Sequence, residues 1–383
     1  VLSDLKILYK YHIYIDDTPM PALGLGTMGF GGYFQEDTSD FSRYVELIEA
    51  AHSLGIRVLD TAEVYGDGAA EKIIGKVAAN IKNSMVIMSK FSPHRTTPSS
   101  IRSALEHTLR RIGRDYIDVY QPHWPNPDID INEIFDCLDK LRDEGKLRYI
   151  GVSNFNAAQL TGHASKISPK FLQCEFNPVN QQQGIELLEH SKKSDGIVVC
   201  YSPFQEGKLL SSVHVAKLAS IAKDLRCTEA QLYLAWIMSH CRTLPIPKTS
   251  NLTRLEENIG SLSVNISREV KALISKTFEV KVSHIEPKRI RPFDEISTDN
   301  TGRPLFRNLE EAIANTINLS PSPSQIAEEI SANDGHLNKP IKIRGTEDGN
   351  FVLVEGRLRY WGWIISYGWN KSIPSIILTD NES

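Results

Sequence analysis

Short apolar runs alternate with longer helical stretches from about residue 24 onward. The short runs hold four to six mostly apolar residues, and in the longer stretches the apolar positions recur every three or four residues. Such runs are typical of strands buried on both faces, and such stretches of helices with one apolar side. The expected strands lie near 24–27 and at 57–60, 85–89, 117–121, 147–152, 171–176, 197–201 and 242–247.

Helical stretches follow these strands, for example at 43–55, 100–113 and 131–145, and several of them end at glycine. Eight strand–helix units in roughly 260 residues predict a closed (β/α)8 TIM barrel rather than an open sheet. Ahead of the first unit, residues 11–21 read as a β-hairpin that closes the bottom of the barrel.

The pattern changes after a helical stretch at 267–278. It continues with an extended, proline-containing segment, two short helices around a Ser/Pro cluster, a hairpin with an Asp-Gly turn, a helix and a final strand. This order predicts an α+β domain. We therefore expect two domains, a barrel at 1–280 and an α+β domain at 281–383.

Composition agrees with this division and excludes several classes of protein. The 383 residues have a net charge of −4, 41% hydrophobic residues and 23% charged residues, which is typical of globular domains. No run is long and apolar enough to cross a membrane. The five cysteines form no CxxC pair, so we expect neither a disulfide framework nor a metal site, and a cytoplasmic location; they are Cys137, Cys174, Cys200, Cys227 and Cys241.

One glycine-rich motif looks like a dinucleotide-binding fingerprint. Residues Gly24 to Gly29 read G-x-G-x-x-G, which in a Rossmann unit follows a strand and opens a helix. Here the next helical pattern begins only at about residue 43. A glycine-rich loop at the mouth of the barrel is the better interpretation, and it leaves open that the loop lies near a cofactor.

Polar residues stand just after several expected strands, at the rim where barrel enzymes hold their active sites. They are Asp60, Tyr65, Lys90 and His123. A carbonyl that accepts hydride needs a proton donor, and tyrosine is too weak an acid unless a cation favours its ionised form. Lys90 would supply that charge, Asp60 would orient Lys90, and His123 would position the carbonyl oxygen.

The motifs DTAEVYG, GVSNF, QCEFNP, YSPF and IPKTSNLTRLEEN occur in this order, together with the histidine of YQPHWP. In this respect residues 10–280 resemble the aldo-keto reductase family. The resemblance implies a (β/α)8 barrel, a nicotinamide cofactor bound in extended form, direct hydride transfer to a small carbonyl substrate, and no metal. It also implies that Asp60, Tyr65, Lys90 and His123 are the catalytic tetrad.

The same resemblance implies the cofactor contacts. Ser153, Asn154 and Gln173 match residues that hold the nicotinamide carboxamide, and Tyr201 matches the aromatic residue on which the ring stacks. The remaining expected contacts are Gly26, Thr27, Asp60, Ser202, Pro203, Phe204, Gly207, Lys248, Thr249, Ser250, Arg254, Glu257 and Asn258.

Residue chemistry gives independent support at one of these places. Lys248 and Arg254 stand six residues apart at a helix start with hydroxyl groups between them, which suits a phosphate dianion. We therefore expect NADPH, with its 2′-phosphate, rather than NADH. The alternative is an ordinary solvated helix start with two cations.

The loop after Pro203 departs from the family pattern, and the role of four aromatic residues is undecided. After Ser202 and Pro203 the chain continues with Phe204, Gln205 and Glu206 where the family usually has Leu and Gly, and Glu206 would repel a phosphate unless it turns outward. Four aromatic residues are candidate pocket walls or simple packing residues: Phe30, Tyr33, Phe91 and Trp124.

The segment from Leu353 to Tyr360, with Gly368 and residues 373–376, resembles the N-terminal domain of ParB-like proteins, which shares its fold with sulfiredoxin. The resemblance covers about 284–380 and implies a nucleotide-binding turn, with ATP, ADP or CTP and Mg²⁺ as ligands. The turn consists of Glu355, Gly356, Arg357 and Arg359, and the alternative is a helix start with exposed arginines. Candidate catalytic bases or metal-binding carboxylates are Glu286, Asp294, Glu295 and Glu355. Lys339 and Arg344 can be read equally well as nucleotide contacts or as solvated residues of the hairpin.

DNA binding is disfavoured, because residues 281–383 carry 12 Lys and Arg against 14 Asp and Glu, and no helix-turn-helix follows. The sequence thus predicts an NADPH-dependent carbonyl reductase joined to a ParB/sulfiredoxin-like nucleotide-binding or phosphotransferase domain. Two rivals stay open: a regulatory protein that senses the NADPH/NADP⁺ ratio, and a protein whose main chemistry is that of a kinase or ATPase in the second domain. The oligomeric state is not predicted.

Overall fold

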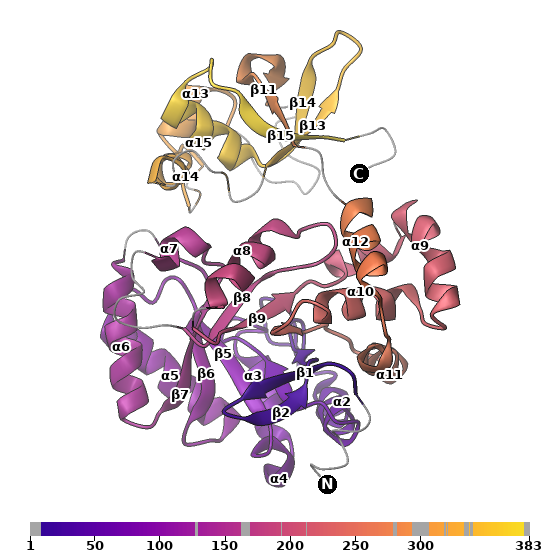
Figure 1. Cartoon of the computed structure of the whole chain (residues 1–383). Coiled ribbons are helices and arrows are strands. Elements are labelled where there is room, and N and C mark those ends of the chain that lie inside the picture. The colour runs from indigo at the N-terminus through magenta and orange to yellow at the C-terminus, as the bar shows by residue number, and fades with distance from the viewer. Residues whose placement is uncertain are drawn as a thin grey trace. The chain divides into compact units, whose positions relative to one another are not determined.

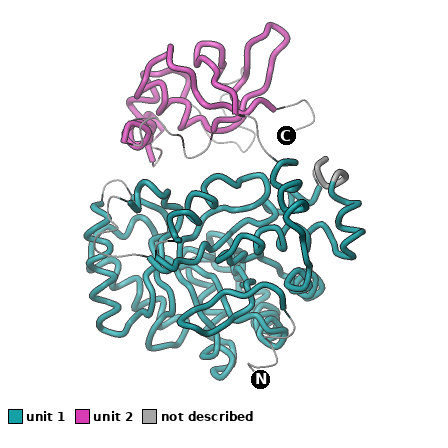
Figure 2. The backbone as a smooth tube through the Cα atoms, viewed as in Figure 1, with its two compact units in different colours: residues 1–278 teal, residues 279–383 magenta. Residues whose placement is uncertain are grey.

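The computed structural model of the chain describes residues 9–126, 129–161, 169–192, 194–211, 213–278, 282–292, 306–317, 319, 321–332, 337 and 340–378. The contacts of the chain gather into two compact units, Val1–Phe278 and Glu279–Ser383 (Figure 2). Each unit has its own hydrophobic core.

The first unit is built on eight parallel strands that are hydrogen-bonded to one another in sequence order (Figure 1). Most of these strands are buried along their whole length, as expected of parallel strands covered by helices. The predicted (β/α)8 barrel is therefore confirmed. The strands are β3 (Leu25–Gly26), β4 (Val58–Asp60), β5 (Val86–Phe91), β6 (Ile117–Pro122), β7 (Leu147–Ser153), β8 (Phe171–Glu175), β9 (Ile197–Tyr201) and β10 (Thr243–Pro245).

Helices follow the strands, and their ends are encoded locally. The helix after β5 begins at a Thr97 capping box with Pro98 in its first turn, and Gly113 ends it in a left-handed conformation. The helices of this unit are α2 (Phe41–Ser53), α3 (Ala69–Lys76), α4 (Ala79–Lys82), α5 (Pro98–Ile112), α6 (Ile131–Asp143), α7 (Ala157–Thr161), α8 (Gln182–Ser191), α9 (Val213–Asp224), α10 (Glu229–Met238), α11 (Leu252–Gly260) and α12 (Arg268–Thr277), with short 3₁₀ turns η1 (Gln205–Ser211) and η2 (Ser261–Ser263).

The seam between the first and the last strand explains the glycine-rich motif. Gly24 N–H donates to the Pro245 carbonyl at 3.0 Å, and Gly26 N–H to the Pro247 carbonyl at 3.2 Å. A Cβ on Gly26 would lie 2.8 Å from the Ile246 carbonyl oxygen, so a larger residue would push the two segments apart. The motif thus closes the barrel. Helix α2 begins only at residue 41, so the motif does not open a helix as it would in a Rossmann unit.

The predicted N-terminal hairpin is present as β1 (His12–Ile15) and β2 (Thr18–Pro21), which pair antiparallel. Its Ile13 and Ile15 side chains belong to the core of the barrel unit. The structure therefore confirms the hairpin and shows which of its residues are anchored.

The second unit is α+β, as predicted. Its five-stranded sheet has the order β11-β15-β13-β14-β12, with antiparallel and parallel pairs alternating across it. The strands are β11 (Val282–Ile285), β12 (Ile290–Arg291), β13 (Ile341–Gly345), β14 (Phe351–Glu355) and β15 (Ile373–Leu378); the helices are η3 (Pro287–Arg289), α13 (Leu309–Ile313), α14 (Pro323–Ala332) and α15 (Arg357–Tyr367).

Aromatic residues of α15 dominate the core of this unit. Tyr360, Trp361 and Trp363 are almost fully buried. The Tyr360 hydroxyl lies near two carbonyl oxygens, those of Pro287 at 3.2 Å and Ile290 at 3.0 Å, and so ties the helix to the start of β12. Across the described ranges, none of the helices has the length and apolar character needed to span a bilayer.

Candidate active site

The ends of three neighbouring strands bring the predicted catalytic residues together. Asp60 is the last residue of β4, Lys90 lies near the end of β5, and His123 directly follows β6. Tyr65 lies in the loop between β4 and α3. All four side chains thus come from the carboxyl-terminal rim of the barrel, where the fold holds its active sites.

Lys90 is the centre of this group. Its Nζ donates to Asp60 Oδ1 at 2.7 Å and to the Thr61 carbonyl at 2.8 Å, and it lies 3.4 Å from the Tyr65 hydroxyl. The side chains of Lys90 and Asp60 are only 2% and 3% exposed. A buried ion pair of this kind is costly to desolvate, so it holds its geometry only because each charge has a partner.

Burial sets the pKa directions of this group. Burial raises the pKa of Tyr65, and the nearby Lys90 cation lowers it again without cancelling the rise. The expected effect of Lys90, which favours the ionised tyrosine, is therefore present, but desolvation outweighs it in the free protein. Burial alone would lower the pKa of Lys90, but Asp60 and Tyr65 outweigh it, so Lys90 stays charged.

His123 is held beside Tyr65. Their rings meet edge to face with centroids 5.7 Å apart. The Asn154 side-chain amide donates to the His123 carbonyl at 2.9 Å. Burial, followed by the Lys90 charge, lowers the pKa of His123 to about 3, so the imidazole is neutral near pH 7 and has one N–H to donate.

A chain of buried amides reaches the same carboxylate from the other side. Gln173 Nε2 donates to Asp60 Oδ2 at 3.1 Å, and Gln121 Nε2 donates to Gln173 Oε1 at 2.7 Å. Ser153 is buried next to Gln173 in the neighbouring strand. Gln121 was not among the residues expected at the site, although it is a polar residue near the carboxyl-terminal end of an expected strand.

The other expected cofactor residues surround this centre. Thr27 is buried, and its hydroxyl donates to the Asp60 carbonyl at 2.9 Å. The Tyr201 hydroxyl donates to Asn154 Oδ1 at 2.7 Å. Gly26 pairs with Lys248 in a parallel bridge, so the glycine segment and the expected phosphate segment lie side by side.

The loop after β9 has an unusual backbone. Ser202, Gln205 and Glu206 all have positive φ values, and Gly207 follows with a φ of 93°. Such conformations cost energy in non-glycine residues and gather at functional sites. Glu206 is exposed, whereas Pro203 is buried and Phe204 half-buried, so the acidic side chain does turn outward.

A cationic cluster lies at the start of α11. Lys248 and Arg254 are exposed, Thr249 is buried and Ser250 half-buried between them, and Asn251 caps the helix. Although Lys248 is exposed, partial desolvation by its neighbours lowers its pKa, and the charges of Arg43 and Arg254 lower it further. Lys248 thus lies near two further cations, and a bound anion would relieve their repulsion of its charge. On the same helix Glu257 is half-buried and Asn258 buried.

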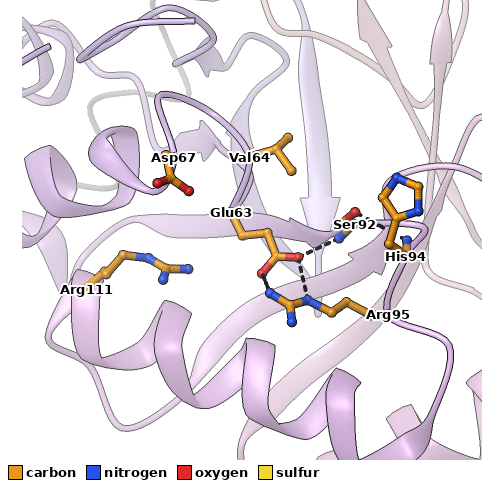
Figure 3. Close-up of a pocket in the computed structure, with 7 residues that line it drawn as sticks. All are labelled: Glu63, Val64, Asp67, Ser92, His94, Arg95 and Arg111. Carbon is orange, nitrogen blue, oxygen red and sulfur yellow. Dashed lines mark hydrogen bonds and ion pairs between the residues drawn. The ribbon is translucent and has the colours of Figure 1, made fainter. Parts of the chain in front are cut away.

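A hollow of about 320 Å³ lies beside the Tyr65 loop (Figure 3). In it Glu63 accepts from Ser92 N–H at 2.7 Å and pairs with Arg95 at 3.1 Å. This contact ties the loop that carries Tyr65 to the loop after β5. None of the four predicted catalytic side chains lines this hollow.

The candidate wall residues fall into two groups. Phe30 is fully buried and stacks on Tyr44 with ring centroids 4.2 Å apart, and Phe91 is buried against Tyr120, so both are packing residues. Tyr33 and Trp124 are 59% and 49% exposed, so the packing of the free protein does not account for them and they stay candidates for a pocket wall.

In the second unit the expected nucleotide turn lies between β14 and α15. Gly356 caps the helix with a φ of 98°. Arg359 donates to the Pro340 carbonyl at 3.0 Å, and Glu355 pairs with Lys342 at 2.6 Å, so both are engaged within the unit. Asp294, Glu295 and Lys339 lie outside the described residues. No group of three potential metal-ligating side chains occurs in the described part of the chain.

The first unit has known relatives. The sequence profile of the Aldo/keto reductase family matches residues 22–278. Methylglyoxal reductase YeaE of Escherichia coli (strain K12) is 32% identical over 269 residues, which cover 68% of this chain and 92% of the relative. The chain therefore belongs to the aldo/keto reductase family, and it is an oxidoreductase.

Solved structures agree with this assignment. A thermostable aldo-keto reductase, Tm1743, in complex with the inhibitor epalrestat has a TM-score of 0.66 and 34% identity, covering 70% of this chain and 99% of its own. An aldo-keto reductase from Klebsiella pneumoniae in complex with NADPH has a TM-score of 0.65 and 27% identity, covering 71% and 95%.

Proposed function

We propose that the barrel reduces an aldehyde or ketone to an alcohol with NADPH, and that Tyr65 is the general acid. The observation that carries this proposal is the contact of the Tyr65 hydroxyl with the buried Lys90–Asp60 pair. When bound, the nicotinamide ring supplies the hydride. The new C–H bond forms as the carbonyl π bond gives its electron pair to oxygen, and Tyr65 protonates that oxygen.

The residues around Tyr65 suit this role. Burial keeps Tyr65 protonated in the free protein, so a proton is available for transfer. As negative charge then develops on the phenolic oxygen, the fixed Lys90 cation 3.4 Å away stabilises it. Neutral His123, next to Tyr65, can donate its N–H to the carbonyl oxygen and orient the substrate.

The cofactor residues suit NADPH. Lys248, with the charges of Arg43 and Arg254 near it, fits an extra phosphate, which NADPH has and NADH lacks. Lys248, Ser250 and Arg254 would hold that phosphate. Ser153, Asn154 and Gln173 would hold the carboxamide, and Tyr201 would stack on the ring.

The test is an assay of the full chain with NADPH and small carbonyls, starting with methylglyoxal, the substrate named for one relative. Loss of NADPH absorbance measures turnover. Tyr65→Phe should lower kcat by at least about 10²-fold, the contribution typical of a general acid, and leave the Kd of NADPH nearly unchanged. Tyr149→Phe, a half-buried tyrosine on β7, is the control. Undiminished kcat in the Tyr65 variant would contradict the mechanism.

The second unit is proposed to be a ParB/sulfiredoxin-like domain that binds ATP, ADP or CTP with Mg²⁺. The support is the left-handed Gly356 at the start of α15, where no side chain caps the first backbone N–H groups and Arg357 is the first helical residue. Calorimetric titration of each nucleotide into the full chain tests this, with Arg357→Gln as the variant. No heat of binding at millimolar nucleotide would contradict it. A role as a sensor of the NADPH/NADP⁺ ratio is less well supported, since a sensor has no need of Tyr65 beside Lys90.

A further inference from the structure

An arginine from the first helix of the barrel lies at the cationic cluster. Arg43 stands in the first turn of α2, and its Nη2 donates to the Ser250 carbonyl at 2.7 Å. Ser250 belongs to the segment between β10 and α11. Arg43 therefore reaches across the seam of the barrel to the segment that carries Lys248.

The space beside this contact is open. A hollow of about 330 Å³ lies between α2 and the start of α11. It is lined from α2 by Arg43, Glu46, Leu47 and Ala50, and from the other side by Ser250, Asn251, Leu252 and Thr253. The guanidinium thus has room for a ligand next to the Ser250 backbone.

Charge at this place is poorly balanced. Lys248 experiences the positive charges of both Arg43 and Arg254. The acidic groups on α2 compensate only in part: Asp40 lies 3.6 Å from Arg43, with both side chains more than half exposed, and Glu46 is exposed at the hollow. Exposed pairs of this kind contribute little, so a dianion would be attracted to the cluster.

We propose that Arg43 is a specificity-determining residue, a third cation that binds the 2′-phosphate of NADPH from the α2 side. This inference rests on the proposed function. A guanidinium has five N–H donors, and the bond to Ser250 uses one of them, so others can reach a phosphate oxygen. Sequence spacing gave no sign of this, because Arg43 and Ser250 are 207 residues apart.

The test compares the Kd of NADPH with the Kd of NADH, both by fluorescence titration of the full chain. Arg43→Gln should raise the Kd of NADPH about tenfold, the effect of losing one charge-assisted hydrogen bond, and change that of NADH less than about twofold. Arg43→Lys keeps the charge and should recover part of the loss. Arg110→Gln, an exposed arginine on α5, is the charge-matched control and should change neither value.

Equal weakening of both cofactors would show that Arg43 only holds the Ser250 segment, and would overturn the inference. An unchanged NADPH preference in Arg43→Gln would overturn it too. In either case the proposed function stands, provided that the wild-type chain binds NADPH. A wild-type chain that binds neither cofactor would instead contradict the proposed function itself.

Discussion

The two units of this chain hold their charged side chains in different ways. In the barrel, Lys90 and Asp60 form a pair with 2% and 3% of their side chains exposed. In the second unit, Lys342 and Glu355 form a pair of similar length with 38% and 53% exposed. A buried ion pair is costly to desolvate, whereas an exposed one changes the stability very little. The buried pair therefore calls for an explanation, and the exposed one does not.

Burial alone does not identify that reason. The barrel has a second buried pair, Arg114 with Asp118, at 2.8 Å. Asp118 lies at the start of β6, the end of the barrel where conserved groups serve stability, whereas Asp60 and Lys90 lie at the carboxyl-terminal rim beside Tyr65. The position of a buried charge on the strand thus distinguishes the pair proposed to take part in the chemistry from the pair at the opposite end of the barrel.

Removing one partner should show the largest difference between the units. Lys90→Met leaves the Asp60 charge buried and unpaired, which should cost about 3–5 kcal/mol of stability and abolish turnover. Lys342→Met should cost at most about 1 kcal/mol and leave turnover intact. Urea denaturation and the NADPH assay measure both. Equal losses of stability in the two variants would break the comparison.

The second unit is expected to depend on its aromatic core instead. Trp361 is 2% exposed and meets the Tyr360 and Trp369 rings edge to face. Trp361→Ala should cost about 3–5 kcal/mol in the unfolding of the second unit, because it leaves a large cavity. Trp369→Ala, at a 37% exposed residue, should cost less. Calorimetric melting checks this, and an effect of Trp369→Ala as large as that of Trp361→Ala would contradict it.

The amide chain behind Asp60 should give a smaller, mainly kinetic effect. Gln121→Leu removes the donor that fixes Gln173, and it also removes the buried Gln121 Oε1, which has no partner among the described residues. The two changes offset each other in stability, so we expect a change below about 1 kcal/mol but a fall in kcat of about fivefold. Gln182→Leu, at an exposed residue of α8, is the control. An unchanged kcat would show that Gln121 does not position the site.

A further effect should appear in the pH dependence of stability. The pKa of His123 is lowered to about 3 in the folded chain, below its ordinary value near 6.5. Between these two pKa values the unfolded chain binds a proton at this histidine and the folded chain does not. The free energy of unfolding therefore keeps its full value above pH 6.5 and falls as the pH drops below it. His123→Gln should flatten the loss between pH 7.5 and 5, whereas His107→Gln, at an exposed residue of α5, should not. Identical slopes would contradict a buried neutral imidazole.

Much of the fold could be predicted from local pattern. Doubly buried parallel strands read as unbroken apolar runs, and caps such as Thr97 and Gly113 mark helix ends, so all eight strands and the order of the second unit followed from the sequence. The four residues proposed as catalytic follow the same logic, because Asp60, Lys90 and His123 stand at strand ends and Tyr65 lies in the loop that follows one of them. That they gather around Lys90 is a property of the barrel.

Only the tertiary structure decided which segments far apart in the chain are in contact. Gln121 and Gln173 meet because their strands curve around one interior. Arg43 meets Ser250 because the first strand–helix repeat of the barrel lies next to the last one. The pKa of Tyr65 also depended on the fold, since the sequence shows a neighbouring cation but not the burial that outweighs it. Local pattern determines which residues reach the rim, and closure of the barrel determines which of them touch.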